Sequence, residues 1–297
     1  MELIAEINVR NSLAESIIWN AEHQTLWWTD IQSKKLYRYY LHNQSLQAWN
    51  TPERLCSFGF TQDPARIVAA FESGFALYDP FNGEIEWLAR PELDYRGTRF
   101  NDGRVDRQGR FWAGTLREKS DTFDDKGEPC RASIYCLNGS SCRRIIEGVH
   151  ATNSLCWSED GTRMYYTDSP TKKIMQAEFD PEKAMPGPAS EFASIDGDGF
   201  PDGSVIDSEG YLWNAEWRGG RVLRYAPDGR VDRVLQVPVW QPTCVCFAGE
   251  HLELLCVSSA RDELPAEKAS ADDCDGNIFI YSTPYKGLQE NLFRLGV

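Results

Sequence analysis

Polar side chains crowd one short stretch of this 297-residue chain, TRFNDGRVDRQGRFWAGT, which runs from Thr98 to Thr115. Its second half is a turn followed by an alternating aromatic strand, whereas its first half holds Arg99, Asn101 and Asp102. Guanidinium groups donate hydrogen bonds to hydroxyl and carboxylate oxygens, and amide and carboxylate oxygens bind hard cations. These residue types therefore suit the recognition of an oxygen-rich small molecule beside a cation.

Three further oxygen-bearing side chains occur in comparable settings: Glu15 in LAES, Asn153 in TNS and Asp202 in PDG. Burying an unpaired carboxylate is costly, so Glu15 and Asp202 close together would need a counter-charge. A divalent metal ion is the simplest source of that charge. Because the set contains no histidine or cysteine, it favours calcium, magnesium or manganese over a dedicated zinc site.

Each of these motifs also has an ordinary structural interpretation. NDG and PDG are common turn sequences, and Glu15 alone could be a solvated loop acid. The stretch DGDGFPDG, residues 196–203, resembles a calcium loop of the EF-hand type but lacks its full set of acids and the flanking helices. The chain has no GxSxG elbow, phosphate loop or GxGxxG motif. Of its four histidines only His150 falls near the proposed site, which leaves a Ser/His/Asp triad without support.

The elements that must position these residues repeat along the chain. Turn signals followed by aromatic or apolar strands occur near Gln24, Ala65, Gly109, Gly161, Gly210 and Gly249. They lie roughly 40 to 50 residues apart, which is the repeat length of β-propeller blades. Second hairpins, such as VLRYAPDGRVDRVL, follow in the same units.

We therefore predict an all-β fold, a six-bladed β-propeller with four antiparallel strands per blade. Residues 1–297 are expected to form this propeller as a single domain. The strand around Ile4 to Val9 is expected to complete the last blade and close the ring. The alternative, a pair of non-repeating β-sandwiches, leaves the regular spacing of the turns unexplained.

The polar residues share one phase of this repeat. The innermost strand of each propeller blade runs along the central channel, so residues equally far before each turn lie at the same depth. Four of the six units hold a carboxylate or amide about eight to ten residues before the turn, including Glu15, Asn153 and Asp202. Unit six offers Gln241 and Thr243, and unit two offers only CSFGF. We therefore expect one site, shared between blades, at one rim of the channel.

Composition excludes several classes of partner. A net charge of −14 and a sequence pI near 4.8 repel phosphate backbones and anionic membranes, which argues against nucleic-acid and membrane binding and suits a small neutral substrate. No apolar run approaches the roughly 18 residues of a membrane span, and the first residues lack the apolar core of a secretion signal. The nine cysteines form no CxxC pair, as is typical of free thiols in a reducing compartment. We expect a cytoplasmic protein that is a monomer or a weak homodimer.

At these residues the sequence resembles the gluconolactonase, regucalcin and luciferin-regenerating-enzyme family of six-bladed propellers. The resemblance extends over residues 13–281 and rests on LAESIIWN, TRFNDGRVDRQGRFWAGTL, TNSLCWSEDGTRMYYTDS, GFPDGSVIDSEGYLWNAEWRGGRVLRYAPDG, QPTCVCFAGEHLELLCVSSAR and GNIFIY.

The resemblance implies one divalent metal ion, held by Glu15, Asn153 and Asp202. Calcium is the expected ion, with zinc, magnesium, manganese and iron as alternatives. It also implies that Arg99 and Asn101 hold the hydroxyls of the substrate. The acid expected shortly after GTL, which also contacts the substrate in relatives, is Glu118 in this chain.

The implied reaction is the metal-dependent hydrolysis of a sugar lactone, an aldonolactone, to the open-chain aldonic acid. The metal ion would polarise the lactone carbonyl, and Asp202 would act as the base, either directly or by orienting a water held by the metal. Two alternatives stay open. One is an esterase or phosphotriesterase on the same fold, and the other is a calcium-binding regulatory propeller without turnover.

Overall fold

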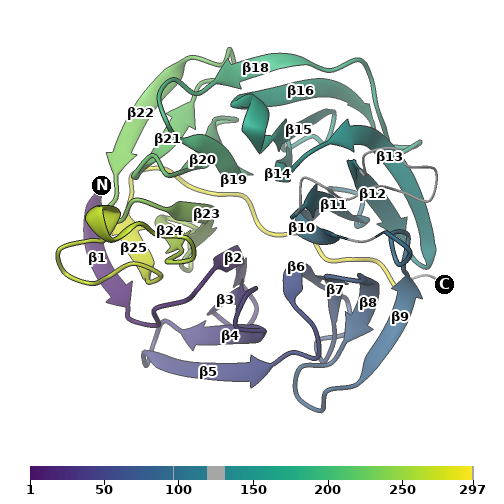
Figure 1. Ribbon diagram of the computed structural model, residues 1–297, viewed down its shortest axis with the longest axis horizontal. Coiled ribbons are helices and arrows are strands. Elements are labelled where there is room, and N and C mark those ends of the chain that lie inside the picture. The colour runs from purple at the N-terminus through teal and green to yellow at the C-terminus, as the bar shows by residue number, and fades with distance from the viewer. Residues whose placement is uncertain (96, 119–130, 296–297) are drawn as a thin grey trace.

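The computed structural model describes residues 1–95, 97–118 and 131–295. Figure 1 shows six antiparallel sheets arranged radially around one axis, each with its innermost strand toward the centre. The all-β, six-bladed propeller predicted from the turn spacing is therefore confirmed. The helical content of the described residues is two 3₁₀ turns, Ser169–Thr171 and Ala266–Lys268.

The first three blades each contain four strands that follow one another in sequence from the centre outward. Blade 1 consists of β2 (Ala14–Asn20), β3 (Thr25–Asp30), β4 (Lys35–Tyr40) and β5 (Ser45–Asn50). Blade 2 consists of β6 (Leu55–Phe60), β7 (Ile67–Phe71), β8 (Gly74–Tyr78) and β9 (Ile85–Ala89). Blade 3 consists of β10 (Thr98–Val105), β11 (Phe111–Arg117), β12 (Ala132–Asn138) and β13 (Ser141–Val149).

The fourth and fifth blades continue this order. Blade 4 consists of β14 (Thr152–Trp157), β15 (Arg163–Asp168), β16 (Lys173–Asp180), β17 (Met185–Pro186) and β18 (Ser190–Ser194). Blade 5 consists of β19 (Phe200–Ile206), β20 (Leu212–Trp217), β21 (Arg221–Tyr225) and β22 (Val231–Gln236). Blade 4 departs from four strands because both β17 and β18 pair with β16. Pro186 ends β17 and Pro188 lies between β17 and β18, and proline cannot donate to a strand ladder, so the outer strand is split.

The sixth blade combines both ends of the chain. It consists of β23 (Pro242–Ala248), β24 (Leu254–Ser259), β25 (Ile278–Ser282) and β1 (Glu2–Ile7). Strand β1 lies slightly before the segment expected from the sequence. It ends at Ile7 because the backbone N–H groups of Val9 and Arg10 donate to the side chain of Asn277 at 3.0 and 2.9 Å instead of to a neighbouring strand.

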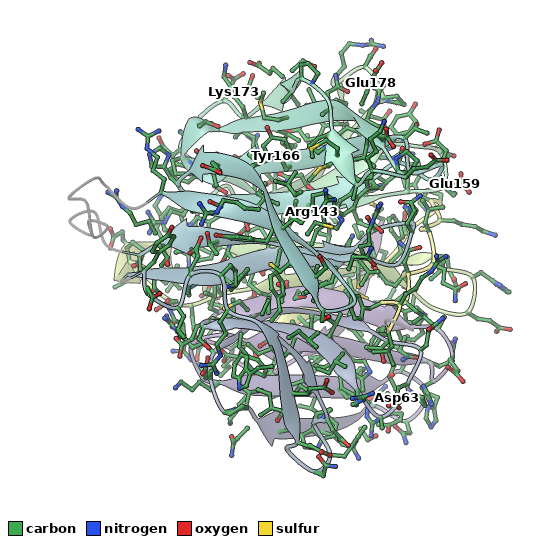
Figure 2. All side chains as sticks on the ribbon, turned by 90° about the vertical axis from the view of Figure 1, so that its right-hand side faces the viewer. Asp63, Arg143, Glu159, Tyr166, Lys173 and Glu178 are labelled. Atoms are coloured by element: carbon green, nitrogen blue, oxygen red, sulfur yellow. The ribbon has the colours of Figure 1, made fainter. Side chains whose placement is uncertain are left out.

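Burial falls from the axis to the rim of each blade. Every residue of β6, β14 and β23 is buried, whereas most residues of the outer strands β5 and β22 are exposed. Figure 2 shows this outer surface on blades 3 and 4, where charged side chains such as Arg143, Lys173 and Glu178 lie on the outside of the molecule. Such charges protect exposed strand edges from pairing with other chains.

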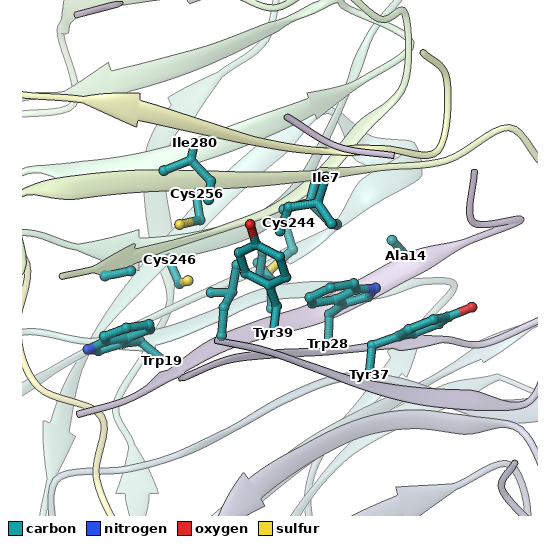
Figure 3. Close-up of a cluster of buried hydrophobic side chains, with 14 residues drawn as sticks. Ile7, Ala14, Trp19, Trp28, Tyr37, Tyr39, Cys244, Cys246, Cys256 and Ile280 are labelled. Atoms are coloured by element: carbon teal, nitrogen blue, oxygen red, sulfur yellow. The ribbon is translucent and has the colours of Figure 1, made fainter. Parts of the chain in front are cut away.

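The hydrophobic core lies between the blades. Six clusters of buried side chains each fill the space between one pair of neighbouring sheets. Figure 3 shows the cluster between blades 1 and 6, in which Trp28 stacks on Tyr37 and the thiol of Cys246 lies beside Trp19. This apolar packing holds neighbouring inner strands in fixed relative positions, and the site depends on that arrangement.

Eight cysteines among the described residues are free, and seven of them are buried. Cys130 lies outside the described residues. Burial raises the pKa of the Cys136 and Cys156 thiols to about 12. These thiols pack as small apolar side chains and are not nucleophiles.

A C-terminal strap, residues 283–295, crosses the centre of the ring and is visible as the yellow segment in Figure 1. Its backbone forms bridges from Gly287 to Asp207 and from Phe293 to Thr61. The strap thereby joins blade 5 to blade 2, which lie on opposite sides of the axis.

Candidate active site

A cavity of about 460 Å³ lies where the inner strands β2, β10, β14 and β19 begin. Its lining includes all six side chains that the sequence assigns to a site: Glu15, Arg99, Asn101, Glu118, Asn153 and Asp202. They come from blades 1, 3, 4 and 5, so the structure brings together residues far apart in the chain. Their roles as metal ligands, substrate contacts and base stay predictions.

A β-bulge interrupts the inner strands where they reach the cavity. The register of β2 shifts directly after Glu15, and that of β14 directly after Asn153. The next residues, Ser16 and Ser154, have φ angles of 51° and 60°, which non-glycine residues rarely adopt. Because a bulge re-aims neighbouring side chains, it lets the backbone direct a carboxylate and an amide into the cavity.

Strands β10 and β19 use glycine at the same point. Their registers also shift there, and the two glycines, Gly103 and Gly203, lie within the strands. A Cβ atom on Gly103 would lie 2.5 Å from Ser57 Oγ, and one on Gly203 would lie 2.5 Å from Cys244 Sγ. The interpretation of NDG and PDG as turns is therefore wrong, because these glycines allow inner strands of adjacent blades to approach closely.

The amide of Asn153 is oriented by hydrogen bonds. Its Nδ2 donates to Ser169 Oγ at 2.8 Å, and Ser169 Oγ in turn donates to the carbonyl of Pro201 at 2.8 Å. Asn101 Nδ2 donates to Asn153 Oδ1 at 2.8 Å. The nitrogen end of Asn153 is thus used for structure, and the oxygen end keeps a second lone pair for a cation.

Arg99 is held in the cavity wall with 6% of its surface exposed. Its Nη1 donates to Asn101 Oδ1 at 2.8 Å and to the carbonyl of Phe100 at 2.9 Å, and its Nε donates to Glu118 Oε1 at 3.2 Å. Glu118 also accepts two hydrogen bonds from Arg54, at 2.6 and 3.0 Å. The carboxylate expected to contact the substrate is therefore already engaged by two arginines.

Glu15 and Asp202 create a strongly unfavourable electrostatic environment for each other. Only 7% and 5% of their surfaces are exposed. Burial, followed by the charge of Asp102, raises the pKa of Glu15 to about 8, although the charge of Arg99 partly opposes this. Burial, followed by the charges of Glu15 and Asp102, also raises the pKa of Asp202 well above its usual value. A bound cation would stabilise both carboxylates in their charged form.

The donor set fits a hard divalent cation. Asp202 Oδ1 is buried and accepts no hydrogen bond from the described residues, so it is available as a ligand. No three His, Cys, Asp or Glu side chains cluster closely enough to hold a metal ion in the described part of the chain. Two carboxylates and an amide remain as candidates, namely Glu15, Asp202 and Asn153, and an oxygen-only set of this kind suits calcium better than zinc.

The backbone that carries Asp202 is tied to its neighbours. Asn214, which is fully buried, donates from Nδ2 to the Asp202 carbonyl at 2.9 Å and to Ser204 Oγ at 2.9 Å. Ser154 Oγ donates to the same Asp202 carbonyl at 2.5 Å. This network connects blades 4 and 5 directly beneath the site and limits the movement of Asp202.

The mouth of the cavity is formed by the loop that follows β24. Glu263 accepts a hydrogen bond from Arg218 Nη2 at 3.2 Å, and Asp262 accepts one from Gln32 Nε2 at 2.9 Å. Phe200 adds apolar surface to the wall, together with Trp217, the residue of β20 that pairs with it. The entrance is thus polar. It offers a hydroxylated ligand two carboxylates, those of Asp262 and Glu263, and the guanidinium of Arg218.

Some polar residues at the expected phase do not line the cavity. Gln241 donates to backbone carbonyls from its Nε2, and Thr243 hydrogen-bonds to the Ala14 carbonyl and Ser258 Oγ. His150 is exposed and pairs with an aspartate of blade 4. These side chains support the architecture around the site.

Sequence reasoning missed Arg54, Ser169 and Asn214. Ser169 lies in a 3₁₀ turn between β15 and β16, and Asn214 lies in the second strand of its blade, so neither shares the phase of the inner strands. Arg54 lies directly before β6, in the unit where counting back from the turn reached only CSFGF. No local pattern identifies any of the three.

No helix in the part of the chain that the structure describes is both long and apolar enough to cross a membrane. The sequence model of the family described as "SMP-30/Gluconolactonase/LRE-like region" matches residues 13–261. The match covers every residue assigned to the site above.

Curated relatives cover almost the whole chain. L-arabinolactonase from Azospirillum brasilense is 36% identical over 290 residues, which cover 95% of this chain and 92% of the relative. 6-deoxy-6-sulfogluconolactonase from Pseudomonas putida is 35% identical over 285 residues, which cover 95% of this chain and 94% of the relative. Both are named as enzymes that act on sugar lactones.

Among solved structures, regucalcin from Agrobacterium tumefaciens, described as a calcium-binding protein, has a TM-score of 0.90 and 30% sequence identity. The match covers 99% of this chain and 98% of that chain. The fold of the whole propeller is therefore shared with this structure.

Proposed function

This chain belongs to the SMP-30/gluconolactonase/LRE-like family, and we propose that it is a metal-dependent lactonase that opens a sugar lactone to the aldonic acid. The observation that carries the proposal is the buried pair Glu15 and Asp202, with Asp202 Oδ1 free, beside the ordered pair Arg99 and Asn101. The names of the two curated lactonases support a sugar lactone as the substrate class.

One divalent metal ion is proposed as cofactor, held by Glu15, Asn153 and Asp202. Calcium is the first candidate, and magnesium, manganese, zinc or iron are to be compared with it. When bound, such an ion would polarise the lactone carbonyl and stabilise the negative charge that develops on its oxygen. The chain's own contribution is a preformed set of oxygens whose backbone is fixed by the bulges in β2 and β14.

Arg99 and Asn101 orient the sugar ring. Their side chains are hydrogen-bonded to each other at 2.8 Å, so a hydroxylated ring meets donors whose positions are already set. Ordering these groups before binding lowers the entropy lost when the substrate docks. The expected substrate is a neutral, polyhydroxylated lactone.

Asp202 is the proposed base. The carboxylate of Asp202 accepts the proton of the attacking water as the water oxygen bonds to the carbonyl carbon. The ring C–O bond then breaks, and the ring oxygen takes the proton back from Asp202 to become a hydroxyl group. The new carboxylic acid loses its proton to water. The product is an anionic aldonate, which the acidic cavity wall repels, so product release is favoured.

The test measures lactone opening by the purified protein with and without a chelator and in Asp202→Asn. Loss of at least about 100-fold in kcat/KM is expected in both cases. Asp228→Asn, an exposed acid of the same blade paired with Arg230, is the matched control and should retain full activity. Undiminished turnover in the chelated protein and in Asp202→Asn would remove the proposed mechanism.

Arg99→Ala tests the substrate contact separately. Removing the guanidinium should mainly raise KM for hydroxylated lactones, because binding of the ring is weakened more than the chemical step. An unchanged KM would show that Arg99 serves only to order its neighbours.

The second candidate function is calcium binding without turnover, which the regucalcin relatives favour. It predicts calcium binding by calorimetry but no opening of any lactone in a panel of different ring sizes. The same panel includes paraoxon-like esters, so that an esterase or phosphotriesterase would also be recognised. Calcium binding together with lactone turnover would reject the second candidate.

A further inference from the structure

We propose that Arg54 is a positioning residue of the site, which acts through Glu118 to hold the guanidinium of Arg99 where it contacts the substrate. The inference rests on the proposed function, because it concerns how that same site holds its ligand. It assigns a role to blade 2, which contributes none of the described residues that line the cavity.

Arg54 lies directly before β6, outside the cavity lining, so its effect on a ligand must be indirect. Its Nη1 donates to Glu118 Oε1 at 2.6 Å and its Nη2 donates to Glu118 Oε2 at 3.0 Å. A bidentate pair of this kind fixes both the position and the plane of the carboxylate. The Nε of Arg54 also donates to Glu72 Oε2 at 2.5 Å, a contact within blade 2, while the bidentate pair with Glu118 alone sets the direction of the guanidinium toward the site.

Glu118 passes this constraint to Arg99. Its Oε1 accepts from Arg54 and also from Arg99 Nε, at 3.2 Å, so one oxygen joins the two guanidinium groups. Burial alone would raise the pKa of Glu118, but the hydrogen bonds and charges of Arg54 and Arg99 lower it overall. The carboxylate is therefore charged and can hold both arginines.

The alternative partners of Arg99 explain why such an anchor is needed. Its positively charged side chain lines the same cavity as the acidic side chains of Glu15 and Asp202. Without Glu118 in place, the attraction between opposite charges would draw the guanidinium toward the two acids and into the space intended for cation and substrate. The link to Arg54 instead keeps Arg99 at the side of the cavity, bonded to Asn101.

The purely structural alternative is that Arg54 only connects β6 to β7 through Glu72. The two interpretations differ in the partner that matters. If Arg54 acts on the site, removing Glu118 should reproduce the effect of removing Arg54, whereas removing Glu72 should affect stability but not ligand binding.

The experiment compares Arg54→Met, Arg54→Lys and Glu118→Gln with the wild type on a lactone that the wild type opens. Arg54→Met should raise KM about tenfold with kcat changed less than twofold, because a charge-assisted hydrogen bond is lost behind a substrate contact. Arg54→Lys should restore part of the affinity, since it keeps the charge but not the bidentate geometry. The double variant Arg54→Met/Glu118→Gln should be no worse than the poorer single variant.

Arg66→Met is the matched control. Arg66 is also an arginine of blade 2 with two acidic partners, Asp63 at 2.9 Å and Glu86 at 3.2 Å, but it has no contact with the cavity. Its KM should equal that of the wild type. Glu72→Gln should likewise leave KM unchanged while lowering the unfolding midpoint.

A readout without turnover separates this inference from the proposed function. Crystal structures of wild type, Arg54→Met and Glu118→Gln show whether the Arg99 guanidinium leaves Asn101 and moves toward Glu15 and Asp202, as we expect. If the wild type opens no lactone, the proposed function fails, and the position of Arg99 still decides the inference. An unmoved Arg99, or an unchanged KM in Arg54→Met, would overturn it.

Discussion

Glu15 and Asp202 are two buried carboxylates of the cavity wall, and no basic side chain among the described residues forms an ion pair with either. Each raises the electrostatic cost of the other, and the nearby Asp102 adds to it. A folded chain gains no stability from such a group of acids. Their position fits the proposed cation site, and the rest of the propeller must offset their electrostatic cost.

Replacing Glu15 by Gln should stabilise the metal-free protein. Burial raises the pKa of Glu15 from its ordinary value of 4.5 to about 8 in the folded state, while in the unfolded state it keeps the ordinary value. Stability is therefore lost as the pH rises from the unfolded pKa through the folded pKa. The advantage of Glu15→Gln should grow between about pH 4.5 and 8 and reach about 1 to 3 kcal/mol in urea unfolding with chelator present.

The control for this prediction is Glu182→Gln, an exposed acid of blade 4, whose stability difference should not change with pH. Calcium should raise the unfolding midpoint of the wild type and leave that of Glu15→Gln unchanged. An advantage of equal size at pH 5 and pH 8 would contradict the assigned cause.

At the scale of strands, the irregular point of each inner strand matters as much for the position of the site residues as the regular part of the strand. The register of every inner strand shifts against the second strand of its blade. The shifts in β2, β10, β14 and β19 coincide with the residues that line the cavity. The second and third strands of each blade pair without a register shift and provide the rigid support for this distortion.

Gly203→Ala should damage the site through the backbone. The new Cβ would lie 2.5 Å from Cys244 Sγ and 2.8 Å from Cys244 Cα, and the Cα belongs to β23 of the next blade. Blades 5 and 6 would have to separate, which should lower the free energy of unfolding by about 1 to 3 kcal/mol in urea. Because Asp202 precedes this glycine, calcium binding measured by calorimetry should weaken as well.

Gly187→Ala provides the comparison, since its added Cβ would meet no atom closer than 3.5 Å. Its stability and calcium binding should match those of the wild type. If Gly203→Ala behaved in the same way, close approach of the inner strands would not be what requires glycine there.

The sequence allowed the blades to be predicted because their turns are chemically explicit. Gly109, Gly161 and Gly210 all have positive φ angles, which is why glycine marks the turn in each of these repeats. Counting back from the turns reaches Glu15, Asn153 and Asp202 because the repeat fixes the length of the inner strand. The family to which these motifs pointed is confirmed by the family match.

The remaining features depend on contacts between blades, which no local pattern encodes. The link from Arg54 to Glu118 joins blades 2 and 3 across 64 positions of sequence. A bulge does not change the pattern of polar and apolar residues in the sequence. The motifs that contain Gly103 and Gly203 were therefore also compatible with turns. Asn214 is a buried polar residue of β20, and its three hydrogen-bond partners are visible only in the folded protein.

At the scale of the whole molecule, the two ends of the propeller axis differ. The cavity occupies one end, while the C-terminal strap crosses the other. Glu290 of the strap lies 3.5 Å from Arg104, which points along the axis from β10 and donates to the Ser204 carbonyl. The strap also donates from Asn291 Nδ2 to the carbonyl of Val105. Its contacts thus cover the ends of β10 and β19 that lie away from the site.

Removing the chain after Thr283 should expose the buried thiol of Cys156. Leu288 and Glu290 line the same small cavity as Cys156, and burial raises the pKa of this thiol to about 12. With the strap gone, water reaches the thiol, its pKa falls toward the ordinary value, and it becomes reactive. One additional thiol should react with an aromatic disulfide reagent at pH 8, and this reaction should disappear in a Cys156→Ser background.

Leu288→Ala gives the same information if the shortened protein does not fold, because it opens the path to Cys156 while keeping the rest of the strap. Cys136, buried between blades 3 and 4 and outside the small cavity that Leu288 and Glu290 line, should stay unreactive in every variant and serves as the internal reference. Equal reactivity of Cys156 with and without the strap would show that the inner strands alone exclude water. The strap would then contribute backbone bonds between opposite blades but would not seal the axis.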